Sequence, residues 1–302
     1  MELEKGRGFK SGYVGIIGKP NVGKSTFMNS VLNFKLAAIS PKPQTTRHKI
    51  LGILTGRNYQ ILFLDTPGIM DRPKHELDRW MVRRAMEALE EADLILMMTE
   101  PYPPEDIDIH IVEEIKEREK PAILAINKVD LVRKPELLPI IDEYSKLYEF
   151  KEIIPVSILK AINFDELLKA IIEYLPEGEP FYPEDMITDR PERFVVQEIL
   201  REKVFQFYGE EIPYTTAVEI EEFIEKSEKH GGKDYIRATI HVERPSQKAI
   251  IIGKGGQAIK RLGIHARREI ELFLGRPVHL ELWVKVSEKW RKNLRFIREI
   301  GY

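Results

Sequence analysis

The chain has 302 residues, a length that predicts two domains of about 150 residues each. Its 47 lysines and arginines nearly balance 49 aspartates and glutamates, so the net charge of -2 by itself predicts neither a nucleic acid nor a membrane partner. Positive charge is nevertheless concentrated at one end, because residues 244–302 carry 14 basic and 5 acidic side chains. This local excess indicates a surface for a polyanion.

The residue types exclude some chemistry. Cysteine is absent, which excludes disulfides and thiolate metal sites, and the seven histidines show no i, i+4 pairing. The first residues lack the apolar core of a signal peptide, and no stretch approaches the ~18 apolar residues of a membrane span. We therefore expect a cytoplasmic protein.

From about residue 12 to 175, apolar strands alternate with amphipathic helices. The expected strands are 13–17, 49–55, 59–65, 92–99, 121–127 and 152–157, and the expected helices are 27–32, 75–91, 105–119, 136–148 and 164–175. This order predicts an α/β fold with a mostly parallel sheet covered on both faces. Ligands of such folds bind at the carboxyl ends of the strands.

Three prolines and a glycine between residues 176 and 183 break the periodicity and predict a linker. We expect a first domain over 1–176, a linker over 177–189 and a smaller α+β domain over 190–302. The second domain is expected to contain helices 190–208, 246–251, 257–274 and 289–300, and strands 214–224, 235–243 and 278–286.

The run Gly18-Lys19-Pro20-Asn21-Val22-Gly23-Lys24-Ser25-Thr26 matches the phosphate-binding loop G-x-x-x-x-G-K-[ST]. A strand precedes it and a helix follows, so backbone N–H groups and the helix N-terminus face a phosphate. Lys24 can reach the β- and γ-phosphates, and Ser25 can ligate Mg²⁺. An ordinary glycine turn is the alternative that this context disfavours.

Asp65-Thr66-Pro67-Gly68 ends the third expected strand. Asp65 can hold an Mg²⁺-bound water, and the Gly68 amide can sense a γ-phosphate. Asp-Thr-Pro-Gly is also a good turn sequence. Its place about forty residues after the phosphate loop, at a strand end, favours the nucleotide role.

Asn127-Lys128-Val129-Asp130 follows another expected strand. A carboxylate such as Asp130 can accept two hydrogen bonds from the N1–H and N2–H₂ edge of guanine, whereas adenine would leave it unpaired. Asn127 can hold the loop, and the stem of Lys128 can cover the base. The motif predicts GTP rather than ATP, against the alternative of a solvated turn.

Together the three motifs resemble the Era family of GTPases, as do Pro20-Asn21 within the loop and Pro43-Gln44-Thr45-Thr46-Arg47. The resemblance implies that Thr46 closes on Mg²⁺ when GTP is bound, with Thr45 as the alternative. Ser157-Ile158 stand where the family usually has Ser-Ala. Isoleucine departs from this pattern, but the contact implied there is a backbone amide to the guanine O6.

The catalytic residues implied by this resemblance are Lys24, Thr46, Gly68 and Asn21. Ras-like enzymes place a water-orienting glutamine directly after Asp-x-x-Gly, where this chain has Ile69, so we expect slow hydrolysis. The resemblance implies that Asn21 helps to hold a K⁺ ion. The alternative is that Asn21 only caps the loop.

In the second domain, Ile252-Gly253-Lys254-Gly255-Gly256-Gln257 forms a Gly-x-x-Gly loop between two expected helices, followed by Lys260 and Arg261. Such a loop lets a nucleic-acid backbone approach closely. We expect the isoleucines at 250–252 to form the apolar floor of a groove that accommodates bases. The segment resembles a KH domain of the second topological type, which implies binding of single-stranded RNA.

The resemblance further implies binding to the 3′ end of 16S ribosomal RNA and a role in small ribosomal subunit assembly and rRNA maturation. It also implies peripheral contact with the anionic inner face of the cell membrane, and we expect a monomer. Two alternatives are an RNA-binding protein that barely hydrolyses GTP and a GTPase domain that serves an RNA-modifying enzyme. The aromatic and basic tail at 290–298 extends the RNA surface, lies on acidic lipid or simply closes the fold.

Overall fold

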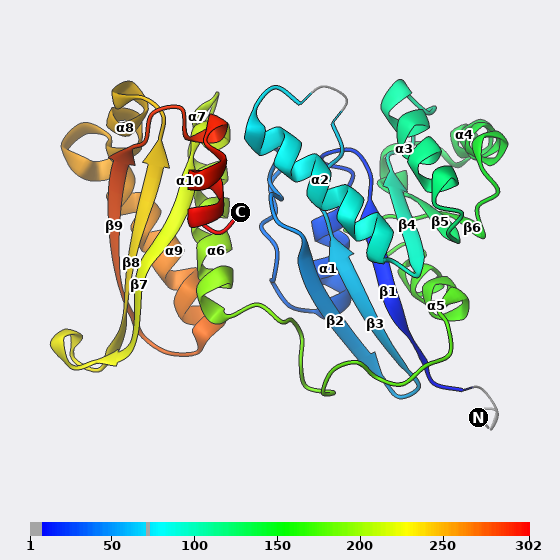
Figure 1. Cartoon of the computed structure of the whole chain (residues 1–302), viewed down its shortest axis with the longest axis horizontal. Helices are drawn as coiled ribbons and strands as arrows, with labels where there is room; N and C mark the ends of the chain where they lie inside the picture. Colours follow the sequence, from blue (N-terminus) through cyan, green and yellow to red (C-terminus); the bar gives the residue numbers. More distant parts are fainter. Residues whose placement is uncertain (1–7, 71–72) are drawn as a thin grey trace. The chain divides into compact units, whose positions relative to one another are not determined.

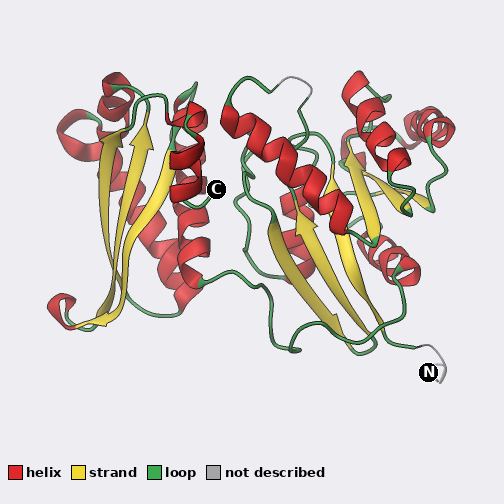
Figure 2. Cartoon of the chain, in the orientation of Figure 1, coloured by secondary structure: helices red, strands yellow, loops and turns green. Residues whose placement is uncertain are grey.

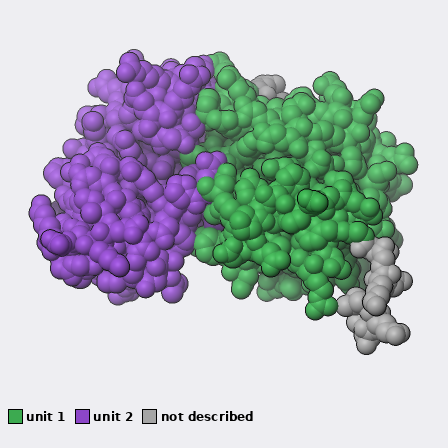
Figure 3. Space-filling view, turned by 60° about the horizontal axis from the view of Figure 1, so that its bottom comes forward, with its two compact units in different colours: residues 1–35, 46–73, 78–189 green, residues 36–45, 74–77, 190–302 purple. Residues whose placement is uncertain are grey.

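The computed structural model describes residues 8–70 and 73–302 (Figure 1). They form two compact units, neither of which is continuous in sequence (Figure 3). The first unit comprises 1–35, 46–73 and 78–189, and the second comprises 36–45, 74–77 and 190–302. The start of the expected first domain, residues 1–7, lies outside the described residues.

The first unit is built on a six-stranded sheet in the order β2-β3-β1-β4-β5-β6. Its strands are β1 (Lys10–Ile17), β2 (Ile50–Gly56), β3 (Tyr59–Asp65), β4 (Leu94–Thr99), β5 (Ala122–Ile126) and β6 (Glu152–Pro155). Its helices are α1 (Lys24–Leu32), α2 (Glu76–Glu91), α3 (Asp106–Glu117), α4 (Lys134–Leu147) and α5 (Phe164–Tyr174), with a 3-10 turn η1 (Val129–Leu131). Only β2 and β3 pair antiparallel, so the predicted mostly parallel α/β sheet is confirmed.

Strands β4 and β5 are apolar except for Thr99 at the end of β4, as expected for strands with helices on both faces of the sheet. Every residue of β4 and β5 is buried. On one face, side chains of α2, α3 and α4 form a core with β4 and β5. On the other face, Phe27 of α1 contacts Phe63 and Phe164 at ring-centroid distances of 5.5 and 5.9 Å. Each fully buried apolar side chain contributes about 1.5–3 kcal/mol, so this layer fixes the strand ends that carry the polar motifs.

The second unit contains a three-stranded sheet in the order β7-β8-β9 (Figure 2). Its strands are β7 (Ala217–Ser227), β8 (Lys233–Val242) and β9 (Val278–Val286). Its helices are α6 (Glu192–Phe207), α7 (Ile212–Thr215), α8 (Pro245–Ile252), α9 (Gln257–Leu274) and α10 (Leu294–Glu299), with 3-10 turns η2 (Glu228–His230), η3 (Lys254–Gly256) and η4 (Trp290–Lys292). Parallel pairing of β8 with β9 requires a crossover, which α8 and α9 supply. This arrangement confirms the predicted smaller α+β domain.

Two expected elements of this unit differ in the structure. The strand expected over 214–224 begins only at Ala217, because the short helix α7 has Pro213 in its first turn and the Thr216 hydroxyl donates to Ile212 O at 2.6 Å. The single helix expected over 289–300 is divided in two. Asn293 lies between η4 and α10, and its Oδ1 accepts a hydrogen bond from Phe296 N at 3.2 Å, so it caps a new helix.

The C-terminal tail places its aromatic residues inside the second unit. Trp290 is 1% exposed and donates through Nε1 to Thr215 O at 2.8 Å. Its ring is stacked with Tyr302 at 6.2 Å, and Ile297 is fully buried. Of the three roles considered for this tail, the packing supports the closing of the fold.

Candidate nucleotide and RNA sites

The phosphate-binding loop joins β1 to α1 and depends on glycine at two positions. Gly18 has φ +149°, and a Cβ there would lie 2.2 Å from Met98 O. Gly23 has φ +107°, and its Cβ would lie 2.3 Å from Asn127 Nδ2. Asn21 also has a positive φ of 69°, a conformation that asparagine tolerates better than most residues. The loop therefore has the tight backbone that can surround a phosphate.

Lys24, at the first position of α1, is buried under the loop. Its Nζ donates to Gly18 O at 3.1 Å and to Lys19 O at 2.8 Å. Burial lowers the pKa of Lys24 to about 8, and the negative charge of Asp65 opposes this only in part. The loop thus holds a partly desolvated cation that an anionic ligand would stabilise.

The side chain of Lys19 turns toward α3 rather than into the loop. Its ammonium lies 2.8 Å from Glu105 Oε2 and 2.9 Å from Asp108 Oδ2. Burial lowers the pKa of Lys19, but the hydrogen bonds and charges of these two carboxylates outweigh it, and the pKa is raised. Lys19 is therefore placed to serve a phosphate only through its backbone.

Three of the predicted metal-site residues converge at the start of α1. Ser25 Oγ lies 2.6 Å from Thr46 Oγ1 and donates to Asp65 Oδ2 at 2.7 Å. Two hydroxyls and a carboxylate form the hard oxygen set that suits Mg²⁺, so the residues fit this ion. Thr45 instead donates its hydroxyl to Lys42 O at 2.6 Å, which favours Thr46 over Thr45 as the ligand.

The segment after β3 passes close to the phosphate loop. Thr66 donates its hydroxyl to Ile16 O at 2.7 Å, and a Cβ at Gly68 would lie 2.6 Å from Pro20 N. Ile69 donates its amide to Gly18 O at 3.2 Å, and its side chain is 1% exposed within the core. The Ile69 side chain thus packs into the core of the first unit.

The predicted guanine site is tied to the phosphate loop through Asn127. Its Nδ2 donates to Val22 O at 2.8 Å, and its Oδ1 accepts from Ile158 N at 3.1 Å. Asp130 is exposed, whereas Lys128 has φ 64° and pairs with Glu100. The Ile158 amide already has this partner, so the guanine contact implied for it requires sharing or exchange. Ser157, which directly precedes Ile158 after β6, is buried.

The Gly-x-x-Gly loop of the second unit lies between α8 and α9. A Cβ at Gly253, where φ is +71°, would lie 2.6 Å from the Ala258 Cβ. Gly255 and Gly256 also have positive φ, but a Cβ at either would meet nothing within 4 Å. Gly253 is therefore required for packing, while the backbone at 255 and 256 is open to a ligand.

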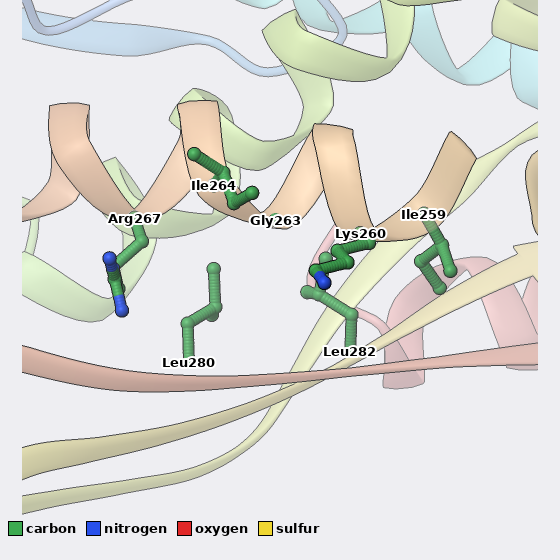
Figure 4. A pocket seen from close by; sticks show the side chains of 7 residues that line it. All are labelled: Ile259, Lys260, Gly263, Ile264, Arg267, Leu280 and Leu282. Atoms are coloured by element: carbon green, nitrogen blue, oxygen red, sulfur yellow. The ribbon is translucent and has the colours of Figure 1, made fainter. Parts of the chain in front are cut away.

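A groove between α9 and β9 adjoins this loop and has a cavity of about 290 Å³ (Figure 4). It is lined by Ile259, Lys260, Gly263, Ile264, Arg267, Leu280 and Leu282. Figure 4 shows Leu280 and Leu282 rising from β9 toward α9, with Lys260 and Arg267 beside them. An apolar floor flanked by cations suits unstacked bases and their phosphates.

Not every residue predicted to contact RNA lines this groove. Ile251, expected in the groove floor, is fully buried in the core of the second unit, and Ile252 is half-buried. Arg261 lies over the Phe207 ring at 5.3 Å. Lys254 and Gln257 are exposed at the loop, as expected for ligand contacts. The groove residues missed from the sequence on α9 follow one helical face at i, i+4 and i+7 from Lys260, a spacing that could have indicated them.

Two further properties concern the described residues as a whole. Across 8–70 and 73–302 we find no group of three or more metal-ligating His, Cys, Asp or Glu side chains. In the same part of the chain, no helix combines the length and apolar character needed to cross a membrane.

Comparison with known proteins identifies a family for each part of the chain. Residues 13–128 match the family described as 50S ribosome-binding GTPase, and residues 211–291 match the KH domain family. A crystal structure of an Aquifex aeolicus Era variant bound to GDP·AlF4⁻ is 47% identical, with a TM-score of 0.93. A structure of Era with MgGDPNP and nucleotides 1506–1542 of 16S ribosomal RNA is 48% identical, with a TM-score of 0.94. Each alignment covers 97% of this chain and 99% of the other, and the chain therefore belongs to the Era family of GTPases.

Proposed function

We propose that this protein is a Mg²⁺-dependent GTPase that binds the 3′ end of 16S ribosomal RNA and acts as a GTP-gated switch in small ribosomal subunit assembly and rRNA maturation. Residues 1–176 would bind and hydrolyse GTP, 177–189 would connect, and 190–302 would bind RNA. The observation that carries the proposal is the convergence of Ser25, Thr46 and Asp65 beside the phosphate loop. The 48% identical Era structure, with its GTP analogue and 16S RNA, supports it.

The nucleotide chemistry follows from the chain's own groups. The loop amides and Lys24 would bind the β- and γ-phosphates, and Asp130 would read the guanine edge. Ser25, Thr46 and, through water, Asp65 would hold Mg²⁺, which when bound neutralises charge on the transferred phosphate. The Gly68 amide, which lies close to Pro20 of the loop, would hydrogen-bond to the γ-phosphate and so respond to its presence.

Hydrolysis by this site is proposed to be slow. The Ile69 side chain is buried in the core and cannot orient an attacking water. We propose that a K⁺ ion, held with the help of Asn21, stabilises part of the negative charge that develops on the phosphates during hydrolysis. The buried Ile69 also favours, as a second candidate, an RNA-binding protein whose main output is nucleotide-dependent binding rather than turnover.

RNA would bind across the 255–256 backbone and along the groove between α9 and β9. The test measures affinity for a 16S 3′-end RNA with GDP and with a non-hydrolysable GTP analogue. Tighter binding with the analogue, lost in Gly253→Asp while basal GTP hydrolysis survives, would support the switch. Lys260→Ala is the milder companion variant, since it leaves the loop backbone intact. Equal RNA affinity in both nucleotide states would refute GTP gating.

The remaining proposals concern where the protein acts. We place it in the cytoplasm as a monomer, with peripheral contact to anionic lipid at the inner face of the cell membrane. The basic excess of residues 244–302 supports a polyanion partner but does not distinguish RNA from lipid. Sedimentation with vesicles, with and without anionic lipid and competing RNA, tests the membrane contact.

A further inference from the structure

We propose that Lys42 and Arg201 are positioning residues that hold the 36–45 segment on α6 and thereby favour GTP over GDP at the nucleotide site. The inference rests on the proposed function and adds to it the contacts that hold Thr45, the residue directly before Thr46. The 36–45 segment runs between α1 and β2 and belongs to the second compact unit. It ends directly before Thr46.

The first half of the 36–45 segment is packed rather than exposed. Leu36, Ala37 and Ala38 are at most 2% exposed. The amide of Ile39 donates to Glu202 Oε2 of α6 at 2.9 Å, and Glu202 is itself buried. A backbone amide held by a buried carboxylate fixes the path of the segment along this helix.

Lys42 anchors the middle of the segment to the C-terminal end of α6. Its Nζ donates to Phe205 O at 2.5 Å and also to Tyr208 O. Carbonyl groups in the last turn of a helix lack helical partners and carry the negative end of its dipole. The ammonium of Lys42 satisfies two of them, so the contact is electrostatically favourable and specific to a cation at this position.

Arg201 anchors the end of the segment. Its guanidinium is buried, its Nε donates to Glu198 Oε1 at 2.9 Å, and its Nη1 donates to Thr45 O. The carbonyl of Thr45 and the amide of Thr46 belong to one rigid peptide plane. Holding Thr45 O therefore restricts the orientation of Thr46, whose hydroxyl lies 2.6 Å from Ser25 Oγ.

This geometry makes α6 sensitive to the nucleotide. The threonine hydroxyl at Thr46 would serve Mg²⁺ only when a γ-phosphate is present, so the anchored segment favours the triphosphate and has little effect on GDP. By linkage, a bound GTP analogue must stabilise the anchored segment by the same factor. The segment thus couples the nucleotide to the first long helix of the RNA-binding unit.

The experiment compares affinities for Mg²⁺·GDP and Mg²⁺·GDPNP in wild type, Lys42→Met and Arg201→Lys. Lysine at 201 retains a cation for Glu198 but loses the planar fork that reaches Thr45 O. We expect GDPNP affinity to fall about fivefold to tenfold in each variant, with GDP affinity changed less than twofold. Arg193→Met is the matched control, because Arg193 lies on α6 but donates to Ile220 O and Glu221 O instead.

Hydrogen exchange provides a second readout that general destabilisation would not reproduce. In wild type, peptides covering 36–45 are expected to exchange more slowly with GDPNP than with GDP, and this difference should disappear in Lys42→Met. An unchanged GDPNP-to-GDP affinity ratio in both variants would overturn the inference while leaving the proposed GTPase intact. A wild type that binds neither nucleotide would overturn the proposed function and this inference together.

Discussion

The lowered pKa of Lys24 predicts that nucleotide affinity falls as the pH rises above neutrality. Without ligand, burial holds this pKa at about 8, against an ordinary value of 10.5. A bound diphosphate favours the charged ammonium and raises the pKa again, so binding takes up a proton above pH 8. The affinity for GDP therefore has its full value at pH values below 8 and falls as the pH rises above 8. The loss amounts to about tenfold between pH 7 and 9, since each pKa unit corresponds to 1.36 kcal/mol.

The assay is GDP affinity measured by fluorescence titration from pH 6.5 to 9, at constant ionic strength and Mg²⁺ concentration. Calorimetry in buffers of different ionisation enthalpy would detect the proton uptake directly. Lys24→Arg is the control, because an arginine stays charged throughout this range and should give a flatter profile. A wild-type affinity that is constant up to pH 9, with no proton uptake, would refute the reasoning.

The same shift has an opposite consequence for the ligand-free fold. Between the lowered pKa of about 8 and the ordinary 10.5, the unfolded chain binds more protons than the folded one. The free energy of unfolding therefore gains a contribution that grows as the pH rises through this window and reaches about 3 kcal/mol above it. Lys24 thus weakens the empty fold at neutral pH, which is consistent with a site that is completed by an anion.

Three further predictions test separate parts of the molecule. Trp290→Ala removes a buried indole and should destabilise the second unit by about 3–5 kcal/mol in urea unfolding, with GDP affinity unchanged; equal stability would contradict the packing of the tail. Gly18→Ala should abolish GDP binding because the new Cβ would meet Met98 O at 2.2 Å, and calorimetry showing wild-type affinity would refute this. Turnover should be faster in K⁺ than in Na⁺ and lose that difference in Asn21→Ala; equal rates in both salts would exclude the ion.

The nucleotide site could be predicted from the sequence because its chemistry is local. The phosphate loop, Asp65 and Asn127 each lie at the end of an apolar strand, and a parallel sheet brings such ends to one edge. The residue that holds Thr45 O could not be found in this way. Arg201 is 156 positions away and sits in a helix whose buried face has no simple periodicity.

The RNA groove could be predicted from the sequence only in part, for a different reason. The glycine loop was evident, but the apolar floor is shared between α9 and β9, and its position depends on how these two elements pack. Ile251 was expected there because it is adjacent to the loop, yet α8 turns it into the core. Tyr214 was assigned to a strand on propensity, whereas it lies in the short helix α7, with the proline before it in the first turn.

Burial and pairing also determine which basic residues near the C-terminus can meet a polyanion. Arg276 forms ion pairs with Asp234 and Glu192, both at 2.5 Å, and Arg291 pairs with Glu243 at 2.6 Å. Among the described residues, Lys254 and Lys260 have no such acidic partner. Part of the charge excess of this region is therefore available beside the open glycine backbone and the groove, where a phosphate would lie when the adjacent bases enter.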